Sequence, residues 1–346
     1  MQAYKFIFWG VLFVSCWSCI QNAETVKKQK KRNHIIQVRD KVKEIEIENV
    51  VISNFAATYI INQYLIISDT KSPDKVIHLF DKNNFNYITS TGDKGLGPFE
   101  ITRLIQMGIN ETERIFYASD HGKQQIYRFE LDSVLVNPHY LPKIHVKMDK
   151  EIWPQNYLAV NDTLFTGTFT LPVKNGDYRP AIGKWNMLTG EIEIMNKYDH
   201  PKIERKRAHF AMSLDHGIFV ECYNHHDLMT ICDLNGELKF YIYGRKWDNA
   251  TQNRINFYRQ VEVCKDKIIA VYADGEDNFV TDKDGKIIPA NYPSQFIIFD
   301  IHGDYMLTLE TGYQIVRFCY DKDSNRIIMA MDDVIQFAYL DMDGII

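Results

Sequence analysis

Apolar and polar positions alternate in short segments along the chain, and the pattern returns six times. Its clearest member in each repeat is an apolar strand that ends at an Asp, Asn or Gly turn. The six segments are 76–81, 125–132, 181–186, 228–236, 296–303 and 335–344. A strand-built period of about 50 residues is typical of β-propellers. The pattern predicts an all-β fold: a six-bladed β-propeller of four-stranded antiparallel blades over residues 42–346.

Each repeat divides into four strands, A to D. In the first repeat they fall at 56–61, 64–68, 76–80 and 86–90, whereas the fourth strand of the second repeat is weak and is placed near Val134. The sixth repeat supplies only three strands, and the alternating segment Val42–Glu48 belongs to no repeat. A three-stranded blade would leave an exposed sheet edge. We therefore expect Val42–Glu48 to pair with Ile335–Leu340 and to close the ring.

The first 20 residues are predicted to be a signal peptide. Lys5 precedes the apolar run Phe6–Val14, which is too short to span a bilayer as a helix. Two Ser-Cys pairs follow, and they resemble the lipobox of bacterial lipoproteins. The resemblance implies a lipid-anchored protein of the cell envelope, on the periplasmic or surface side of the outer membrane, with Cys16 (or Cys19) lipidated. A plain secretory signal is the alternative. Residues 21–41 are polar and basic and predict a flexible tether.

Four further cysteines lie within strand patterns. Cys222, Cys232, Cys264 and Cys319 lack the spacing of a metal site. We expect buried free thiols. Cys222 and Cys232 fall on two strands of one hairpin, which leaves a disulfide between them open in an exported protein.

A glycine-rich turn follows the first repeat. Residues 91–101 read TGDKGLGPFEI and contain Gly95, Gly97, Pro98 and Glu100. The glycines permit a tight turn, and the Glu100 carboxylate can cap backbone N–H groups. A phosphate-binding loop is disfavoured, because no Gly-Lys-Ser/Thr ending follows. The turn, the lipobox, the six repeats and the chain length together resemble the TolB-like six-bladed propeller lipoproteins of Bacteroidetes, whose blades are NHL- and YWTD-like. That resemblance implies a fold and an address, and no particular activity.

Asp69, Asp120, Asp274 and Asp332 recur where second strands end. Carboxylates that converge on a propeller channel would bind calcium and support a metal-dependent hydrolase. Asp residues at equivalent turns also cap backbone N–H groups, and we favour this interpretation. We expect no metal site and no cofactor, with calcium as the one ion left open. The sequence His225-His226-Asp227 is interpreted as a polar turn, because adjacent side chains of an extended segment point apart.

The connections between strands divide into two faces. The D-to-A and B-to-C connections form one, called here the long-loop face, and the A-to-B and C-to-D turns form the short-loop face. The short-loop turns are acidic, whereas segments 137–156, 196–209 and 243–259 carry 12 Lys or Arg against five Asp or Glu. Arg with Trp and Tyr suits sugar rings and carboxylate or sulfate groups, although a solvated rim has a similar composition. The candidate ligand-binding residues are Trp153, Tyr178, Arg179, Arg205, Arg207, His209, His225, His226, Arg245, Trp247 and Arg259.

The net charge of −5 is mild and argues against a nucleic-acid-binding protein. The favoured hypothesis is a non-catalytic binding or scaffold propeller of the cell envelope. It would be monomeric and lipid-anchored to the membrane, and its long-loop face would recognise an anionic glycan or an envelope protein. A propeller enzyme, either a metal-dependent lactonase or hydrolase or a lyase, is the alternative, with its site at the channel mouth. A third hypothesis is protein–protein contact through the acidic short-loop face.

Overall fold

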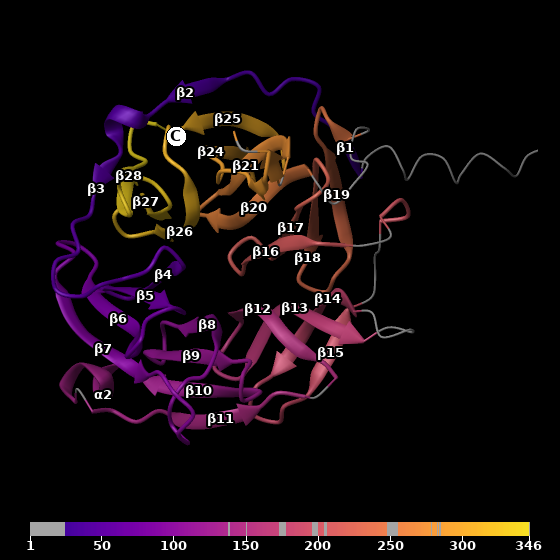
Figure 1. Ribbon diagram of the computed structural model, residues 1–346. Helices are drawn as coiled ribbons and strands as arrows, with labels where there is room; N and C mark the ends of the chain where they lie inside the picture. Colours follow the sequence, from indigo (N-terminus) through magenta and orange to yellow (C-terminus); the bar gives the residue numbers. More distant parts are fainter. Residues whose placement is uncertain are drawn as a thin grey trace, which may run out of the picture.

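Six β-sheets form a ring in the computed structural model, which confirms the predicted six-bladed β-propeller (Figure 1). The structure describes residues 25–137, 139–149, 151–172, 178–195, 200–203, 206–247, 255–277, 279–281, 283 and 285–345. Within these ranges the only helices are α2 (Leu131–Val136) and the 3-10 turn Arg39–Lys41. None of the helices described is long and apolar enough to cross a membrane.

Each blade has four antiparallel strands, numbered here from the centre of the ring outwards. Blades I to III follow the chain directly, whereas blades IV to VI also receive strands from the N-terminal segment. The strands are β4 (Ala56–Ile61), β5 (Tyr64–Asp69), β6 (Lys75–Asp81) and β7 (Tyr87–Asp93) in blade I; β8 (Leu104–Asn110), β9 (Ile115–Asp120), β10 (Gln125–Glu130) and β11 (Lys143–Lys147) in blade II; β12 (Trp153–Ala159), β13 (Leu164–Pro172), β14 (Tyr178–Asn186) and β15 (Ile192–Met195) in blade III; β16 (Ala208–Ser213), β17 (Ile218–Tyr223), β18 (Leu228–Asp233) and β19 (Leu238–Tyr243) in blade IV; β20 (Ile255–Cys264), β21 (Lys267–Asp277), β24 (Gln295–Asp300) and β25 (Tyr305–Glu310) in blade V; and β26 (Ile315–Asp321), β27 (Arg326–Met331), β28 (Phe337–Asp341) and β3 (Lys43–Glu44) in blade VI.

Burial follows the position of a strand within its blade. Every residue of β9, β17 and β27, the second strands of three blades, is buried. Their apolar side chains pack against the neighbouring blade, so the core consists of clusters between blades. One cluster joins Ile269 and Phe296 of blade V to Phe318 and Met329 of blade VI. Burial of apolar surface between successive blades therefore holds the ring together.

The ring closes through an N-terminal strand, as predicted. β3 pairs antiparallel with β28, with Glu44 opposite Ala338 and Lys43 opposite Tyr339. The Ile45 N–H extends the pairing by donating to the carbonyl of Phe337 at 2.8 Å. The paired segment is shorter than the predicted one, because only Lys43–Glu44 is a strand within Val42–Glu48.

The predicted flexible tether is instead a bound strap from Thr25 onwards. We call residues 25–44 the N-terminal strap. Its strand β1 (Val26–Lys28) pairs parallel with β19, and β2 (Ile35–Gln37) pairs parallel with β25. Figure 1 shows the strap passing along the outer side of blades IV, V and VI in turn. Without the strap, the outer edges of β19 and β25 would have unpaired backbone N–H and C=O groups. Such an edge can pair with any chain segment, including a basic one.

The fourth strand of blade II also differs from its predicted position near Val134. That segment forms α2, whose Leu131 and Val134 are buried three residues apart on one helical face. The strand that completes the blade is β11, which pairs with β10. Burial of two apolar residues at helical spacing outweighs the local β-propensity here.

The four described cysteines are buried free thiols, as expected. Cys222 lies opposite Met229, whereas Cys232 lies opposite Phe219. The two cysteines of this hairpin are therefore not cross-strand neighbours, which excludes the disulfide that the sequence left open.

The glycine-rich turn has the predicted cap. The Gly97 N–H donates to Oε2 of Glu100 at 2.6 Å. A Cβ on Gly95 would overlap the same Glu100 oxygen, so a larger residue at this position would displace the capping carboxylate. The Asp carboxylates at the ends of β5 and β9 are also caps: Asp69 accepts the N–H groups of Ser53 and Lys71, and Asp120 accepts those of Thr102, Arg103 and Gly122.

Candidate functional site

The long-loop face carries the extended connections of the propeller. β13 and β14 continue as a hairpin in which Pro172 lies opposite Tyr178. Between β21 and β24, a second hairpin is formed by β22 (Phe279–Thr281) and β23 (Ile287–Pro289). Large side chains on these hairpins are exposed to solvent, with Tyr178 at 54 %, Phe279 at 56 % and Ile287 at 71 %. Exposed aromatic and aliphatic groups on a rigid scaffold favour a binding role for this face.

Two predicted residues meet on blade III. Trp153 begins the innermost strand β12 and Tyr178 begins β14, and their ring centroids are 5.2 Å apart at 52°. Arg179 is exposed beside them, opposite Leu171 in the hairpin. The pair offers an aromatic surface next to a guanidinium at the long-loop end of the blade.

A second aromatic group lies on blade IV around Trp247. Its ring is 4.7 Å from that of Tyr243, 4.9 Å from His200 and 5.7 Å from His226. Nε2 of His200 also lies 2.8 Å from the Tyr243 hydroxyl. Burial lowers the pKa of His200 to about 4, with His226 and Lys202 as lesser causes, so the imidazole is neutral at pH 7.

The remaining predicted residues are dispersed or already engaged. Nδ1 of His225 lies 2.8 Å from the carbonyl of Ile255, whereas the ring of His226 lies beside Trp247. Arg245 forms an ion pair with Asp274 at 2.5 Å. Arg207 is exposed on the connection between blades III and IV. The predicted residue Arg205 lies outside the described residues, as do Cys16 and Cys19.

Basic groups gather at the centre of the ring. His209 lies on β16, Arg259 on β20 and Arg317 on β26, the innermost strands of three successive blades. Burial lowers the pKa of His209 to about 3, and the charges of Arg317 and Arg259 lower it further. The charge of Arg317 also lowers the pKa of Tyr59 on β4, another innermost strand, against the larger effect of burial. Because Arg317 interacts electrostatically with residues on the innermost strands of three other blades, its guanidinium faces the centre of the ring.

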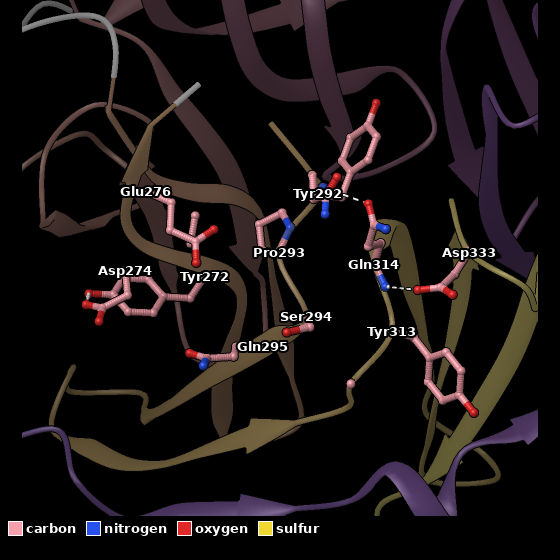
Figure 2. Close-up of a pocket in the computed structure, with 13 residues that line it drawn as sticks. Tyr272, Asp274, Glu276, Tyr292, Pro293, Ser294, Gln295, Tyr313, Gln314 and Asp333 are labelled. Carbon is pink, nitrogen blue, oxygen red and sulfur yellow. Dashed lines mark hydrogen bonds between the residues drawn. The ribbon is translucent and has the colours of Figure 1, made fainter. Parts of the chain in front are cut away.

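A hollow of about 460 Å³ lies between blades V and VI on the same face (Figure 2). Hydrogen bonds from backbone N–H groups to side chains hold its wall. The Tyr292 N–H donates to Oε1 of Gln314 at 3.2 Å, and the Gln314 N–H donates to Oδ2 of Asp333 at 3.1 Å. Polar groups dominate the lining, which comprises Tyr272, Ala273, Asp274, Glu276, Asn291, Tyr292, Pro293, Ser294, Gln295, Gly312, Tyr313, Gln314 and Asp333.

The three tyrosine rings of the hollow contact arginines. The guanidinium carbon lies 5.5 Å from the ring centroid for Arg32 over Tyr272, 5.1 Å for Arg259 over Tyr292 and 5.0 Å for Arg39 over Tyr313. Figure 2 shows the rings of Tyr292 and Tyr313 directed away from the hollow, and the Glu276 carboxylate directed towards Pro293. The open wall is therefore acidic and amide-rich, and the aromatic surfaces already have cationic partners.

The recurrent Asp residues do not converge on a metal. In blade V, Asp274 receives the Tyr272 hydroxyl at 3.0 Å and pairs with Arg245 and Lys246, instead of capping a turn. Across the described ranges, no group of three or more His, Cys, Asp or Glu side chains is arranged to hold a metal ion.

Sequence reasoning missed Arg317 and most of the hollow. The predicted binding residues come from the segments between predicted strands, whereas Arg317 lies inside the strand Ile315–Asp321. A charged residue between the apolar neighbours Val316 and Phe318 was the available signal. Tyr272 and Glu276 both lie on the strand β21, outside the segments from which the candidate residues were taken.

No model of a known protein family matches the sequence. No curated protein matches it either. Three solved structures share the fold at low identity. A putative exported protein from Bacteroides fragilis has a TM-score of 0.53 and 11 % identity, covering 89 % of this chain and 88 % of its own. A member of the DUF4221 family from Bacteroides vulgatus has a TM-score of 0.56 and 8 % identity over 86 % and 94 %. The Cps50 (Swd1) β-propeller domain of Myceliophteria thermophila has a TM-score of 0.52 and 9 % identity over 86 % and 99 %. At these identities the likeness concerns the fold alone.

Proposed function

We propose that this chain is a non-catalytic binding or scaffold propeller of the cell envelope, whose long-loop face recognises an anionic glycan or a partner protein. The observation that carries the proposal is the concentration of extended hairpins and exposed aromatic groups on one face, represented by Tyr178 beside Trp153. Arg179 is exposed beside these rings, and Arg207 is a further exposed arginine on the connection between blades III and IV. Aromatic surface with nearby guanidinium groups suits sugar rings that carry acidic substituents.

The proposed location is the periplasmic or surface side of the outer membrane, to which the chain is lipid-anchored. The lipobox-like Cys16 and Cys19 support this, as do the TolB-like turn and the fold shared with a putative exported protein. The strap adds an orientation. Thr25 lies beside His216 and His302, which belong to short-loop turns. An anchor attached before Thr25 would leave from the short-loop side and direct the long-loop face away from the membrane.

The test is a panel of acidic glycans and peptidoglycan fragments, with retention and thermal shift as readouts. We expect Trp153→Ala and Tyr178→Ala each to weaken retention about tenfold or more, since aromatic anchors dominate binding free energies. Leu188→Ala is the matched control, because Leu188 is 74 % exposed on a short-loop turn. Equal retention by all three variants would refute the assignment to the long-loop face.

A further inference from the structure

Arg259 and Arg317 are held side by side by the residue next to each in the chain. Oε1 of Gln260 accepts the Phe318 N–H at 2.9 Å, and its Nε2 donates to the Phe318 carbonyl at 2.6 Å. These two bonds join β20 to β26 at the centre of the ring. The two guanidinium groups therefore lie near each other because their strands are joined, and their positions do not depend on flexible loops.

Neither guanidinium has an anionic partner within the described residues. Nε of Arg259 is buried and lacks a hydrogen-bond acceptor among the described residues, and the guanidinium lies over the ring of Tyr292 at 5.1 Å. Arg317 is exposed and donates to the carbonyl of its own neighbour Val316 at 3.3 Å. Buried donors without an acceptor are rare in folded proteins, because they have lost water and gained nothing in return.

The electrostatics of the pair are unfavourable as they stand. Burial lowers the pKa of Arg259; Tyr292 opposes this in part, and the charge of Arg317 adds a smaller lowering. Two other arginines of this face have anionic partners: Arg245 pairs with Asp274, and Arg32 pairs with Asp227 at 2.6 Å. Two like charges in a partly desolvated place attract a counter-ion.

We propose that a carboxylate, sulfate or phosphate group binds between Arg259 and Arg317 at the long-loop end of the ring centre. Guanidinium forks match the planar or tetrahedral oxygens of these groups, and the orphaned Nε–H of Arg259 supplies one donor. His209 flanks the site as a neutral imidazole, with Nε2 lying 3.1 Å from the Asn224 amide. The inference rests on the proposed function and deepens it, because it places the acidic group of the ligand.

The acidic hollow on the other side of Tyr292 restricts the anion to the arginine side. Glu276 and Asp333 line that hollow, and their charges would repel a second anion. A ligand that occupies both places must therefore present its acidic group to Arg259 and hydroxyl, amide or amino groups to the hollow. A mono-acidic sugar has this polarity, whereas a uniformly charged polyanion does not.

The test uses inorganic anions on the whole protein, in thermal-shift and calorimetric titrations at matched ionic strength. Sulfate and phosphate form one arm and acetate the other. This comparison separates recognition of a tetrahedral oxyanion from recognition of a planar carboxylate. Sulfate, phosphate or acetate should raise the Tm of the wild type by about 2 °C or more, as ligand linkage requires. Arg259→Gln and Arg317→Gln should weaken anion binding about tenfold each. Arg103→Gln, an exposed arginine on blade II of the same face, should leave it unchanged.

Folding of the variants is itself informative. In anion-free buffer, Arg317→Gln should leave Tm unchanged or raise it, because it removes a like charge from Arg259. If no anion stabilises the wild type, or if both variants retain wild-type anion binding, the inference is overturned. If an acidic glycan binds wild type and both variants equally, the inference fails while the proposed function stands. If inorganic anions bind at the arginines but no glycan or partner is retained, the proposed function fails and the anion site stands.

Discussion

At the scale of single residues, Arg32 shows how a basic run hides a structural side chain. It is buried, whereas the neighbouring Lys31 is exposed. Nη1 of Arg32 pairs with Oδ1 of Asp227 at 2.6 Å and lies 3.1 Å from the Tyr272 hydroxyl. The guanidinium also lies over the rings of Tyr272 and Phe299. The planar guanidinium of arginine can stack on these rings and pair with Asp227 at the same time, whereas the ammonium group of lysine cannot stack in this way.

Arg32→Met should destabilise the protein by about 3–5 kcal/mol, because it leaves the fully buried Asp227 without its cation. The measurement is urea denaturation at pH 7. Lys31→Met is the matched control and should cost less than about 0.5 kcal/mol. A double variant that adds Asp227→Asn should lose less than the sum of the single losses, since the two residues interact directly. Strictly additive losses would argue against the pair.

Glu262 makes the stability of the protein depend on pH between about 4.5 and 8. Burial raises the pKa of Glu262 to about 8 from its ordinary 4.5, although the Tyr320 N–H and the Gln260 amide oppose this by bonding to the carboxylate. The folded state thus favours the neutral carboxyl. Its contribution to stability is fully present below pH 4.5 and is lost as the pH rises through about 8.

Glu262→Gln should therefore remove a loss of stability that the wild type shows between pH 5 and pH 8. We expect the wild type to lose on the order of 2–4 kcal/mol relative to the variant across this range. The acid side should be the same in both, because burial lowers the pKa of His200 and His209 and these groups destabilise the fold only when the pH falls below their unfolded value. Parallel profiles for the two proteins at pH 5–8 would exclude a raised pKa.

At the scale of elements, amide side chains connect the innermost strands of neighbouring blades. Gln106 of β8 donates to Asn156 of β12 at 3.2 Å, and Asn156 donates to the carbonyl of Phe210 on β16 at 3.3 Å. Gln260 makes the corresponding connection from β20 to β26. These strands belong to different sheets, so side chains supply hydrogen bonds that no backbone ladder provides.

Gln260→Leu should cost about 2–4 kcal/mol, because it leaves the N–H and carbonyl of the buried Phe318 without partners. Gln155→Leu is the control, since Gln155 is exposed and its amide bonds to Thr170 at the surface. Equilibrium denaturation of both variants measures the difference. Equal losses would show that the connection between blades V and VI does not depend on the amide.

The strands could be predicted where one local pattern decided their structure. Residues Ala56–Ile61 form the predicted strand to the residue. The N-terminal strap could not be predicted, because Arg32 is fixed by an Asp 195 positions away and β1 by an edge that exists only after blade IV has formed. The site divides in the same way: Trp153 and Tyr178 were found from loop composition, whereas the role of Arg317 depends on β20 and β26 being adjacent.

At the scale of the whole molecule, the strap connects three blades that are already consecutive in the ring. It contributes β1 to blade IV, β2 to blade V and β3 to blade VI. Two of its arginines, Arg32 and Arg39, contact tyrosines that line the hollow. The segment that leads to the proposed membrane anchor thus packs against two tyrosines of the hollow, and its removal should affect ring closure and the hollow together.

Stepwise truncation separates these contributions. The reference is a chain that starts at Thr25; a second starts at Val38 and lacks β1, β2 and Arg32; a third starts at Asn49 and also lacks β3. We expect Tm to fall at each step, first through the unpaired Asp227 and then through the open edge of β28, which should also cause self-association on gel filtration. A synthetic peptide of residues 38–48 should restore the Tm of the third chain towards that of the second, and a scrambled peptide should not. If the chain from Asn49 melts within about 1 °C of the reference and stays monomeric, the strap does not close the ring.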